Sequence, residues 1–182
     1  MHERQINGLF CCKIATGSTP GRGKWGLLIA LPVLGLLANT AAVAREVLGV
    51  HGNWAAFRAE DPARCYAVAA PVVAADGAFA SVATWPARRI PGQLHLRLGR
   101  PARGGSAILL TIEGRPFQLV GRGVDAWASD AATDRAIVAA MRTGVSMSVA
   151  ARDTAGRSFG HAFPLSGAAT ATDAAVLACR PR

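Results

Sequence analysis

The sequence predicts an all-β domain, a compact antiparallel β-sandwich with one or two short helices, preceded by an N-terminal signal peptide. Three observations support this prediction. Apolar and polar residues alternate in several short segments, turn residues separate these segments, and only one stretch has a clear helical pattern. Seven or so short strands with one or two helices are typical of a sandwich with a helix packed across it.

The clearest predicted strand is GQLHLRLG at 92–99, in which three leucines alternate with polar residues. Successive side chains of a strand point to opposite faces, so the leucines are expected to face the core. The segments SAILLTIEG and FQLV, joined by EGRP, predict an antiparallel hairpin. The predicted inward residues of these segments are Leu94, Leu96, Leu98, Ile108, Leu110, Ile112, Phe117 and Leu119.

Four shorter segments complete the predicted strands. CYAVAAP and FASVATW flank a loop at 76–77, and SMSVAA and RSFGHAFPL flank the turn DTAG. The predicted inward residues of the second pair are Met147, Val149, Phe159, Phe163 and Leu165.

One helix is predicted over TDRAIVAAMRTG, with Thr133 as its N-cap and Gly144 beyond its end. A second helix is predicted, on a weaker pattern, over TATDAAVLA before Cys179. The apolar stripe of the first helix is Ala136, Ile137, Ala140 and Met141.

The N-terminus has the pattern of a secretory signal peptide. A basic flank precedes GLLIALPVLGLLA at 26–38, and the small residues Ala42 and Ala44 follow it. This pattern predicts cleavage after Ala44, before Arg45. The alternative is an uncleaved inner-membrane anchor, although a span needs about 20 predominantly apolar residues and Pro32 interrupts this run.

Three regions follow from this interpretation. Residues 1–24 are an N-terminal extension, either disordered or the product of a miscalled start codon, and residues 25–44 are the apolar signal region. Residues 45–182 form a single β-sandwich domain of 138 residues. A domain of that size buries about two-thirds of the surface that its unfolded chain exposes.

The predicted domain is basic, with a net charge of +6 from 16 arginines and 10 acidic residues, and it contains no lysine. Such a balance attracts anionic partners. The arginines are scattered and no aromatic residues interleave with them, so a nucleic-acid partner is not expected. The candidate anion-binding residues are Arg88, Arg89, Arg97, Arg100 and Arg103.

No metal site, cofactor or catalytic residue is predicted. His95 alternates outward, toward solvent, and His161 is expected in the core or at an edge. Neither of them, nor His51, has the spacing of a helical metal pair. Ser106 lacks the G-x-S-x-G pattern of a nucleophile elbow, and no helix N-terminus adjoins Cys65 to lower its pKa.

The three tryptophans of the domain, Trp54, Trp85 and Trp127, stand on separate segments. They are expected to fill the core of an alanine-rich domain that has few other large side chains. The alternative is that they gather on one face and form a stacking platform for a ligand.

Four segments, taken in order, resemble the invasion-associated locus B family of alphaproteobacterial envelope proteins: GNWAAF, CYAVAAP, DRAIVAAMRTGVSMSV and FPLSGAATATDAAVLAC. The resemblance covers most of residues 51–179. It implies a small periplasmic or surface β-protein, linked by the family's name to host-cell invasion.

The function expected from all these features is that of an exported, non-enzymatic interaction module of the periplasm or cell envelope. Its partner is an unidentified envelope or surface molecule, with membrane contact only through an uncleaved N-terminal segment. Two alternatives stay open. One is a cryptic periplasmic hydrolase that uses Ser106 or a thiol, and the other is a binder of anionic envelope glycans through the five candidate arginines.

Cys65 and Cys179 are the two cysteines of the predicted mature domain, an even number in an oxidising compartment. One lies in an early strand and the other near the C-terminus, so a disulfide between them is predicted. The alternative is two independent buried thiols.

Overall fold

The computed structural model describes residues 45–75 and 77–180. The predicted extension at 1–24 and the predicted signal region at 25–44 lie outside the described residues. Within those residues, no helix has the length and apolar character required to cross a membrane.

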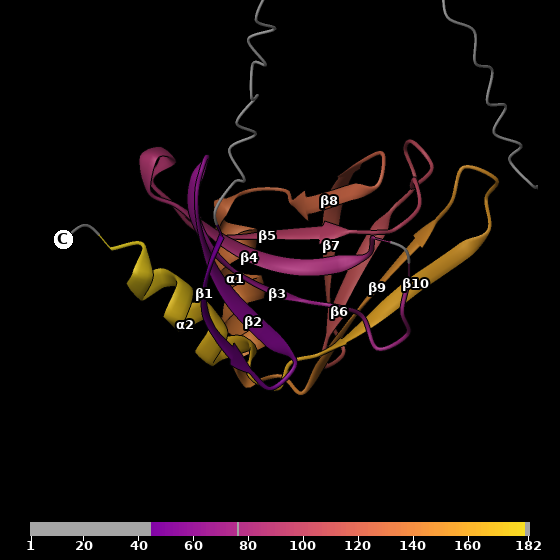
Figure 1. The fold of residues 1–182 in the computed structure, drawn as a ribbon. Coiled ribbons are helices and arrows are strands. Elements are labelled where there is room, and N and C mark those ends of the chain that lie inside the picture. Colours follow the sequence, from indigo (N-terminus) through magenta and orange to yellow (C-terminus); the bar gives the residue numbers. More distant parts are fainter. Residues whose placement is uncertain (1–44, 76, 181–182) are drawn as a thin grey trace, which may run out of the picture. The chain divides into compact units, whose positions relative to one another are not determined.

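Within the described residues, ten antiparallel strands form a single hydrogen-bonded sheet, which curves around the core (Figure 1). The all-β prediction is therefore confirmed. The strand order across the sheet is β1-β2-β3-β4-β5-β8-β7-β6-β9-β10. The strands are β1 (Arg45–His51), β2 (Trp54–Glu60), β3 (Ala63–Ala69), β4 (Phe79–Trp85), β5 (Ile90–Arg97), β6 (Ile108–Ile112), β7 (Arg115–Arg122), β8 (Asp125–Ala128), β9 (Ser146–Arg152) and β10 (Ser158–Pro164).

Two helices cover the inner face of the sheet, and both are predicted by the sequence. Helix α1 (Ala131–Thr143) packs on β5, β6 and β8, whereas α2 (Ala168–Ala178) packs on β1 to β5. Their apolar residues join those of the strands in one core cluster. All the predicted inward strand residues are buried in it except Phe159, which is partly buried against it.

Helix α1 begins earlier than predicted, so the assignment of Thr133 as N-cap is wrong. The N-cap is Asp130, whose Oδ1 accepts a hydrogen bond from the backbone N–H of Thr133 at 2.8 Å. This bond holds the pKa of the Asp130 carboxyl below its usual range, with further help from the Ser129 and Thr133 hydroxyls. Asp and Thr are both residue types that cap helices, and Asp130 precedes Thr133 by three positions.

The predicted disulfide is present. The Sγ atoms of Cys65 on β3 and Cys179 after α2 are 2.05 Å apart, and their Cα atoms are separated by 5.8 Å. Cys65 is fully buried on the inner face. The bond therefore fastens the end of α2 to the middle of β3.

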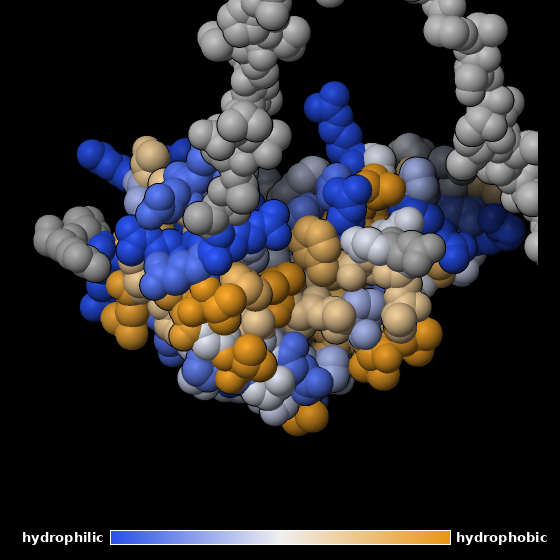
Figure 2. Space-filling model, in the orientation of Figure 1, coloured by the Kyte–Doolittle hydropathy of each residue, from blue (hydrophilic) through white to orange (hydrophobic). Residues whose placement is uncertain are grey.

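Some large apolar side chains remain exposed at the margins of the sheet. Val47 and Val50 lie on β1, the first strand of the sheet, and Val72 and Val73 follow β3. The backbone N–H of Val72 donates to the carbonyl of Ala162 on β10, the last strand. Figure 2 shows apolar residues, in orange, among hydrophilic ones on the face that it presents.

Candidate ligand-binding groove

A groove of about 650 Å³ lies over β2, β3, β4, β5 and β8, on residues that alternate with those of the core, and Arg45 of β1 borders it. We call it the outer groove. Its lining combines aromatic rings, arginines and a few small residues. The lining residues are Arg45, Phe57, Arg64, Tyr66, Val68, Phe79, Ser81, Ala83, Trp85, Gln93, His95 and Trp127.

The groove exists because β4 carries small outward residues between strands with larger ones. Ser81 is paired with Val68 on β3 and with His95 on β5. In the next row, Ala83 is paired with Tyr66 and Gln93 in the same way. Paired residues of neighbouring strands lie on the same face. The two small side chains therefore form a floor, and the larger neighbours form the walls.

Aromatic stacking holds both walls in place. On one side, the rings of Phe57 and Tyr66 are stacked with centroids 5.5 Å apart. On the other side, His95 stacks on Trp127 at 5.3 Å, and Phe79 meets the same imidazole edge-on at 5.3 Å. Such pairs add about 0.5–1.5 kcal/mol beyond the burial of their area, so the walls are ordered without a ligand.

Asp125 fixes the orientation of the imidazole in this stack. His95 Nε2 lies 2.9 Å from Asp125 Oδ1, and Arg97 approaches the same carboxylate oxygen at 3.5 Å. The sequence pattern predicts a solvated His95. The structure instead places it half-buried against Trp127, because β8 pairs with β5 at this position.

Guanidinium groups lie over the rings at one end of the groove. The Cζ atom of Arg64 is 5.4 Å from the ring centroid of Tyr66 and 5.2 Å from that of Trp85. Arg88 lies over the same indole at 5.1 Å. Cation–π contacts of this kind are worth about 0.5–2 kcal/mol each, and here they hold the charges beside the groove.

The structure does not bring the five candidate arginines together. Arg88 and Arg89 precede β5, whereas Arg97 ends it and Arg100 and Arg103 lie in the following loop. Seven residue steps of an extended strand span about 23 Å, so the set falls into two groups. Of the five, Arg88 adjoins the outer groove through its contact with Trp85.

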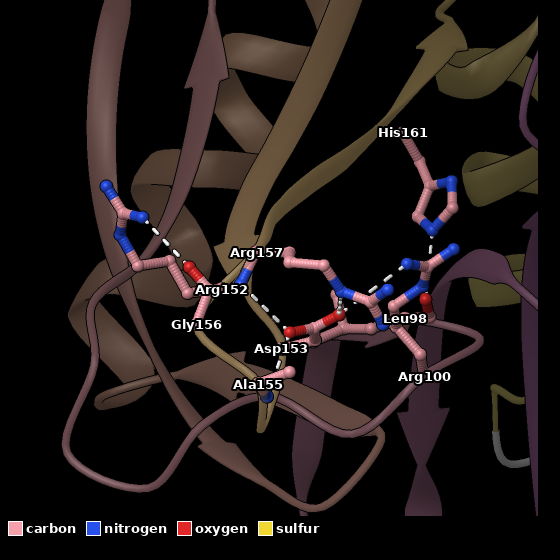
Figure 3. A network of polar contacts seen from close by, with 8 residues as sticks. All are labelled: Leu98, Arg100, Arg152, Asp153, Ala155, Gly156, Arg157 and His161. Atoms are coloured by element: carbon pink, nitrogen blue, oxygen red, sulfur yellow. Dashed lines mark hydrogen bonds and ion pairs between the residues drawn. The ribbon is translucent and has the colours of Figure 1, made fainter.

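One member of the second group, Arg100, lies together with Arg157 beside a buried carboxylate, Asp153, in the turn between β9 and β10 (Figure 3). Asp153 Oδ1 accepts hydrogen bonds from the backbone N–H groups of Ala155 and Arg157. Its Oδ2 accepts from Arg157 Nε at 3.0 Å and lies 3.8 Å from a guanidinium nitrogen of Arg100. Arg100 and Arg157 therefore have a carboxylate counter-charge close by.

Burial by itself raises the pKa of the Asp153 carboxyl. The backbone N–H of Arg157, its guanidinium and the backbone N–H of Ala155 outweigh that effect, and the net pKa lies below the usual range. The carboxylate is therefore the form that this turn stabilises.

The nucleophile candidates lie apart from the groove. Cys65 is bonded to Cys179, and the Ser106 hydroxyl donates to the carbonyl of Arg103 at 2.7 Å. His161 Nε2 lies 2.9 Å from the carbonyl of Leu98. Across residues 45–75 and 77–180, no hydrogen bond joins Ser106 to a histidine, and no cluster of three potential metal ligands is found.

The three tryptophans divide between the two predicted roles. Trp54 is fully buried in the core, where its Nε1 donates to the carbonyl of Pro164 at 2.9 Å. Trp85 and Trp127 line the outer groove instead. The stacking-platform alternative therefore applies to two of them.

Five residues that line the outer groove are not among the site residues that the sequence predicts: Phe57, Tyr66, Phe79, Arg45 and Arg64. A signal for the first three is present in the alternation. Each occupies an outward position in a strand whose buried residues are small or aliphatic, except for Trp54 at the start of β2. An outward face of a strand is normally polar, so aromatic residues at those positions indicate a binding surface.

Comparison of the chain with protein-family models, with curated proteins and with solved structures found no match. The functional assignment therefore depends on the chemistry of the outer groove itself.

Proposed function

We propose that this protein is an exported, non-enzymatic binding module of the bacterial envelope that holds a ligand in the outer groove. The supporting observation is the groove itself, a volume of about 650 Å³ enclosed by stacked rings on five strands of one sheet. Ligand sites have volumes of about 300–1,000 Å³, apolar and aromatic walls, and a small number of placed polar groups.

The polar groups of the groove favour binding over catalysis. Ser81 is nearly buried and its hydroxyl is directed to the carbonyl of His95 at 3.5 Å, so it is not poised as a nucleophile. His95 itself is held by Asp125 and faces rings on two sides. A hydrolase would need a nucleophile within hydrogen-bond reach of a base, and the Cys65–Cys179 bond removes the thiol candidate.

Two features support export as part of the proposal. A structural disulfide is typical of an oxidising compartment such as the periplasm, and the N-terminal sequence has the signal-peptide pattern with cleavage after Ala44. An uncleaved inner-membrane anchor is the alternative. The resemblance to invasion-associated locus B proteins is in keeping with an envelope location.

Nuclear magnetic resonance of the indole N–H groups tests the binding function. The ¹⁵N-labelled protein is titrated with a library of small ring compounds of neutral, anionic and cationic character. Binders are expected to shift the indole signals of Trp85 and Trp127. The signal of Trp54, buried and bonded to Pro164, serves as the internal control and is expected to stay in place.

A variant with a larger side chain at the floor of the outer groove provides a second test of binding. Ser81→Leu places a larger side chain between Val68 and His95, and it is expected to abolish the shifts while the Trp54 signal keeps its native position. Binders that shift the Trp54 signal alone, or that bind S81L equally well, would refute the proposal.

A further inference from the structure

We infer that the outer groove selects a ring-shaped ligand bearing an anionic group, and that Arg64 pairs with that group. This inference rests on the proposed binding function and specifies the class of ligand. The chemistry in question is a carboxylate attached to a six-membered ring, either the pyranose of a uronate-containing saccharide or an aromatic ring.

The charges that line the groove are all of one sign. Arg45 and Arg64 belong to the lining, Arg88 lies over one of its rings, and none of the described lining residues is acidic. Among the described residues, no carboxylate lies within 4.0 Å of these three guanidinium groups. The arginines at the far end of β5 differ, because Arg97 and Arg100 are paired with Asp125 and Asp153. The groove therefore has the uncompensated charge that an anion would neutralise.

Arg64 is held in a geometry suited to that role. Its guanidinium lies over both Tyr66 and Trp85, and the side chain is partly buried. The N–H groups of a guanidinium lie in its plane. When the face of the group packs on rings, these N–H groups stay available at the edge. Those groups match a carboxylate in a two-bond arrangement, and two ring contacts reduce the side-chain entropy that pairing would cost.

A second donor at the same end of the groove lacks an acceptor. Nε1 of Trp85 is inaccessible to solvent and has no hydrogen-bond partner among the described residues. A buried N–H without a partner is unfavourable, because it has lost its hydrogen bond to water. Neighbouring atoms cover this N–H in the described conformation, so an anionic ligand would accept from it only after the indole or the Arg64 side chain that lies over it has shifted.

The rest of the groove fits the body of a ring. Ser81 and Ala83 contribute little side-chain volume at the floor, and the stacked pair of His95 and Trp127 forms a wall on β5 and β8, across β4 from Arg64 on β3. Flat apolar faces, whether the C–H face of a pyranose or an aromatic ring, pack on such walls. A volume of about 650 Å³ leaves space for more than one ring.

Isothermal titration calorimetry with matched acid and ester probes tests this inference. One arm uses trigalacturonate and its methyl ester, and the other uses 4-hydroxybenzoate and its methyl ester. The acid of at least one arm is expected to bind about tenfold more tightly than its ester, and more weakly at high salt. The arm with the tighter acid identifies the ring.

Two variants with the same change of net charge separate a specific pair from general attraction. Arg64→Gln is expected to weaken binding of the acid about tenfold or more. Arg103→Gln, in the loop beyond β5, is expected to leave the affinity unchanged. Unchanged thermal melting and an unchanged Trp54 indole signal show that each variant is folded.

The outcomes distinguish this inference from the proposed function. Acid and ester that bind equally and shift the Trp85 and Trp127 signals would overturn the charge selection but uphold the groove as a binding site. Equal losses in R64Q and R103Q would also overturn it, because attraction would then be unspecific. If neither acid binds while other library compounds shift the two indoles, the ligand class is wrong and the binding function stands.

Discussion

Cys65 and Cys179 are joined by a disulfide across 114 positions of the chain, and the bond ties the end of α2 to the inner face of β3. The outer face of the same strand carries Tyr66 and Val68, which line the groove. The disulfide therefore secures the layer that supports the candidate site.

Replacing both cysteines, in Cys65→Ala/Cys179→Ala, is expected to lower the free energy of unfolding by about 4–5 kcal/mol. The reason is the entropy that the unfolded chain regains when a loop of this length is opened. Guanidinium-induced unfolding of the oxidised protein and of the double variant measures the difference. A change below about 1 kcal/mol would contradict the role assigned to this bond.

Thiol labelling provides the independent control. Cys11 and Cys12 are first replaced by serine, so that the remaining cysteines are the bonded pair. The denatured, unreduced protein is then expected to incorporate no thiol reagent. The reduced protein is expected to be labelled at two cysteines. Two reactive thiols without reductant would show that the bond does not form.

The strands and the disulfide could be predicted from the sequence because their signals are local or countable. Leu94, Leu96 and Leu98 alternate with polar residues, and this alternation alone fixes the face that each strand buries. The cysteine pairing followed from an even number of cysteines in one predicted compartment. Both inferences are independent of which strands become neighbours.

The groove could not be predicted because it depends on the order of strands in the sheet. β8, a strand of four residues, inserts between β5 and β7 and brings Trp127 beside His95. No local pattern specifies that neighbour. The strands β1 and β2 are not predicted for another reason. Ala56 and Ala59 occupy two of the three buried positions of β2, and β1 has no buried residue, so neither strand shows a strong apolar alternation.

Gly167→Ala is expected to destabilise the protein by more than about 3 kcal/mol, because the position lacks both space and conformational freedom. Gly167 has a φ of +85°, and a Cβ atom there would lie 1.8 Å from the carbonyl oxygen of His51. The contact places the start of α2 against the turn between β1 and β2.

Gly105→Ala is the matched control for this variant. Its φ of +74° is similar, but a Cβ atom there meets nothing within 4 Å. Only the cost of a left-handed backbone then remains, about 1–2 kcal/mol. Urea unfolding of both variants gives the comparison, and equal losses would contradict the proposed close contact.

The stability that Asp153 provides is expected to disappear in acid. Its carboxyl pKa is lowered in the folded protein, so its contribution is present above the unfolded value of about 3.9. That contribution is lost as the pH falls through the folded pKa, since the unfolded chain then binds the proton more readily.

Asp153→Asn tests this expectation. The amide oxygen still accepts from the backbone, but the amide nitrogen faces the Nε donor of Arg157, so D153N is expected to unfold at a lower denaturant concentration at neutral pH. The difference from the unsubstituted protein is expected to shrink as the pH falls below about 4. Arg152→Gln, which removes only a bond to the carbonyl of Gly156, is the control. A difference that is constant between neutral and acidic pH would contradict the assignment.

Truncation of Trp54 is expected to cost more stability than truncation of Trp127, and truncation of Trp127 is expected to cost more binding, since one residue supports the core and the other the groove. Trp54 is fully buried and donates to the carbonyl of Pro164 on β10. Trp54→Ala therefore removes a large buried side chain and a hydrogen bond between β2 and β10. The expected loss is about 3–5 kcal/mol of unfolding free energy. Trp127 is half-buried and contacts His95 on the outer face, so Trp127→Ala is expected to cost about 1–2 kcal/mol.

The binding measurement reverses this ranking. W127A removes one wall of the groove and is expected to weaken binding of the acid probe about tenfold, because stacking on the ligand ring is lost. Trp54→Phe keeps most of the core volume, loses the bond to Pro164 and is expected to bind the probe with unchanged affinity. Calorimetric titration of the two folded variants decides the matter. An affinity that falls in W54F but not in W127A would place the binding site away from the outer groove.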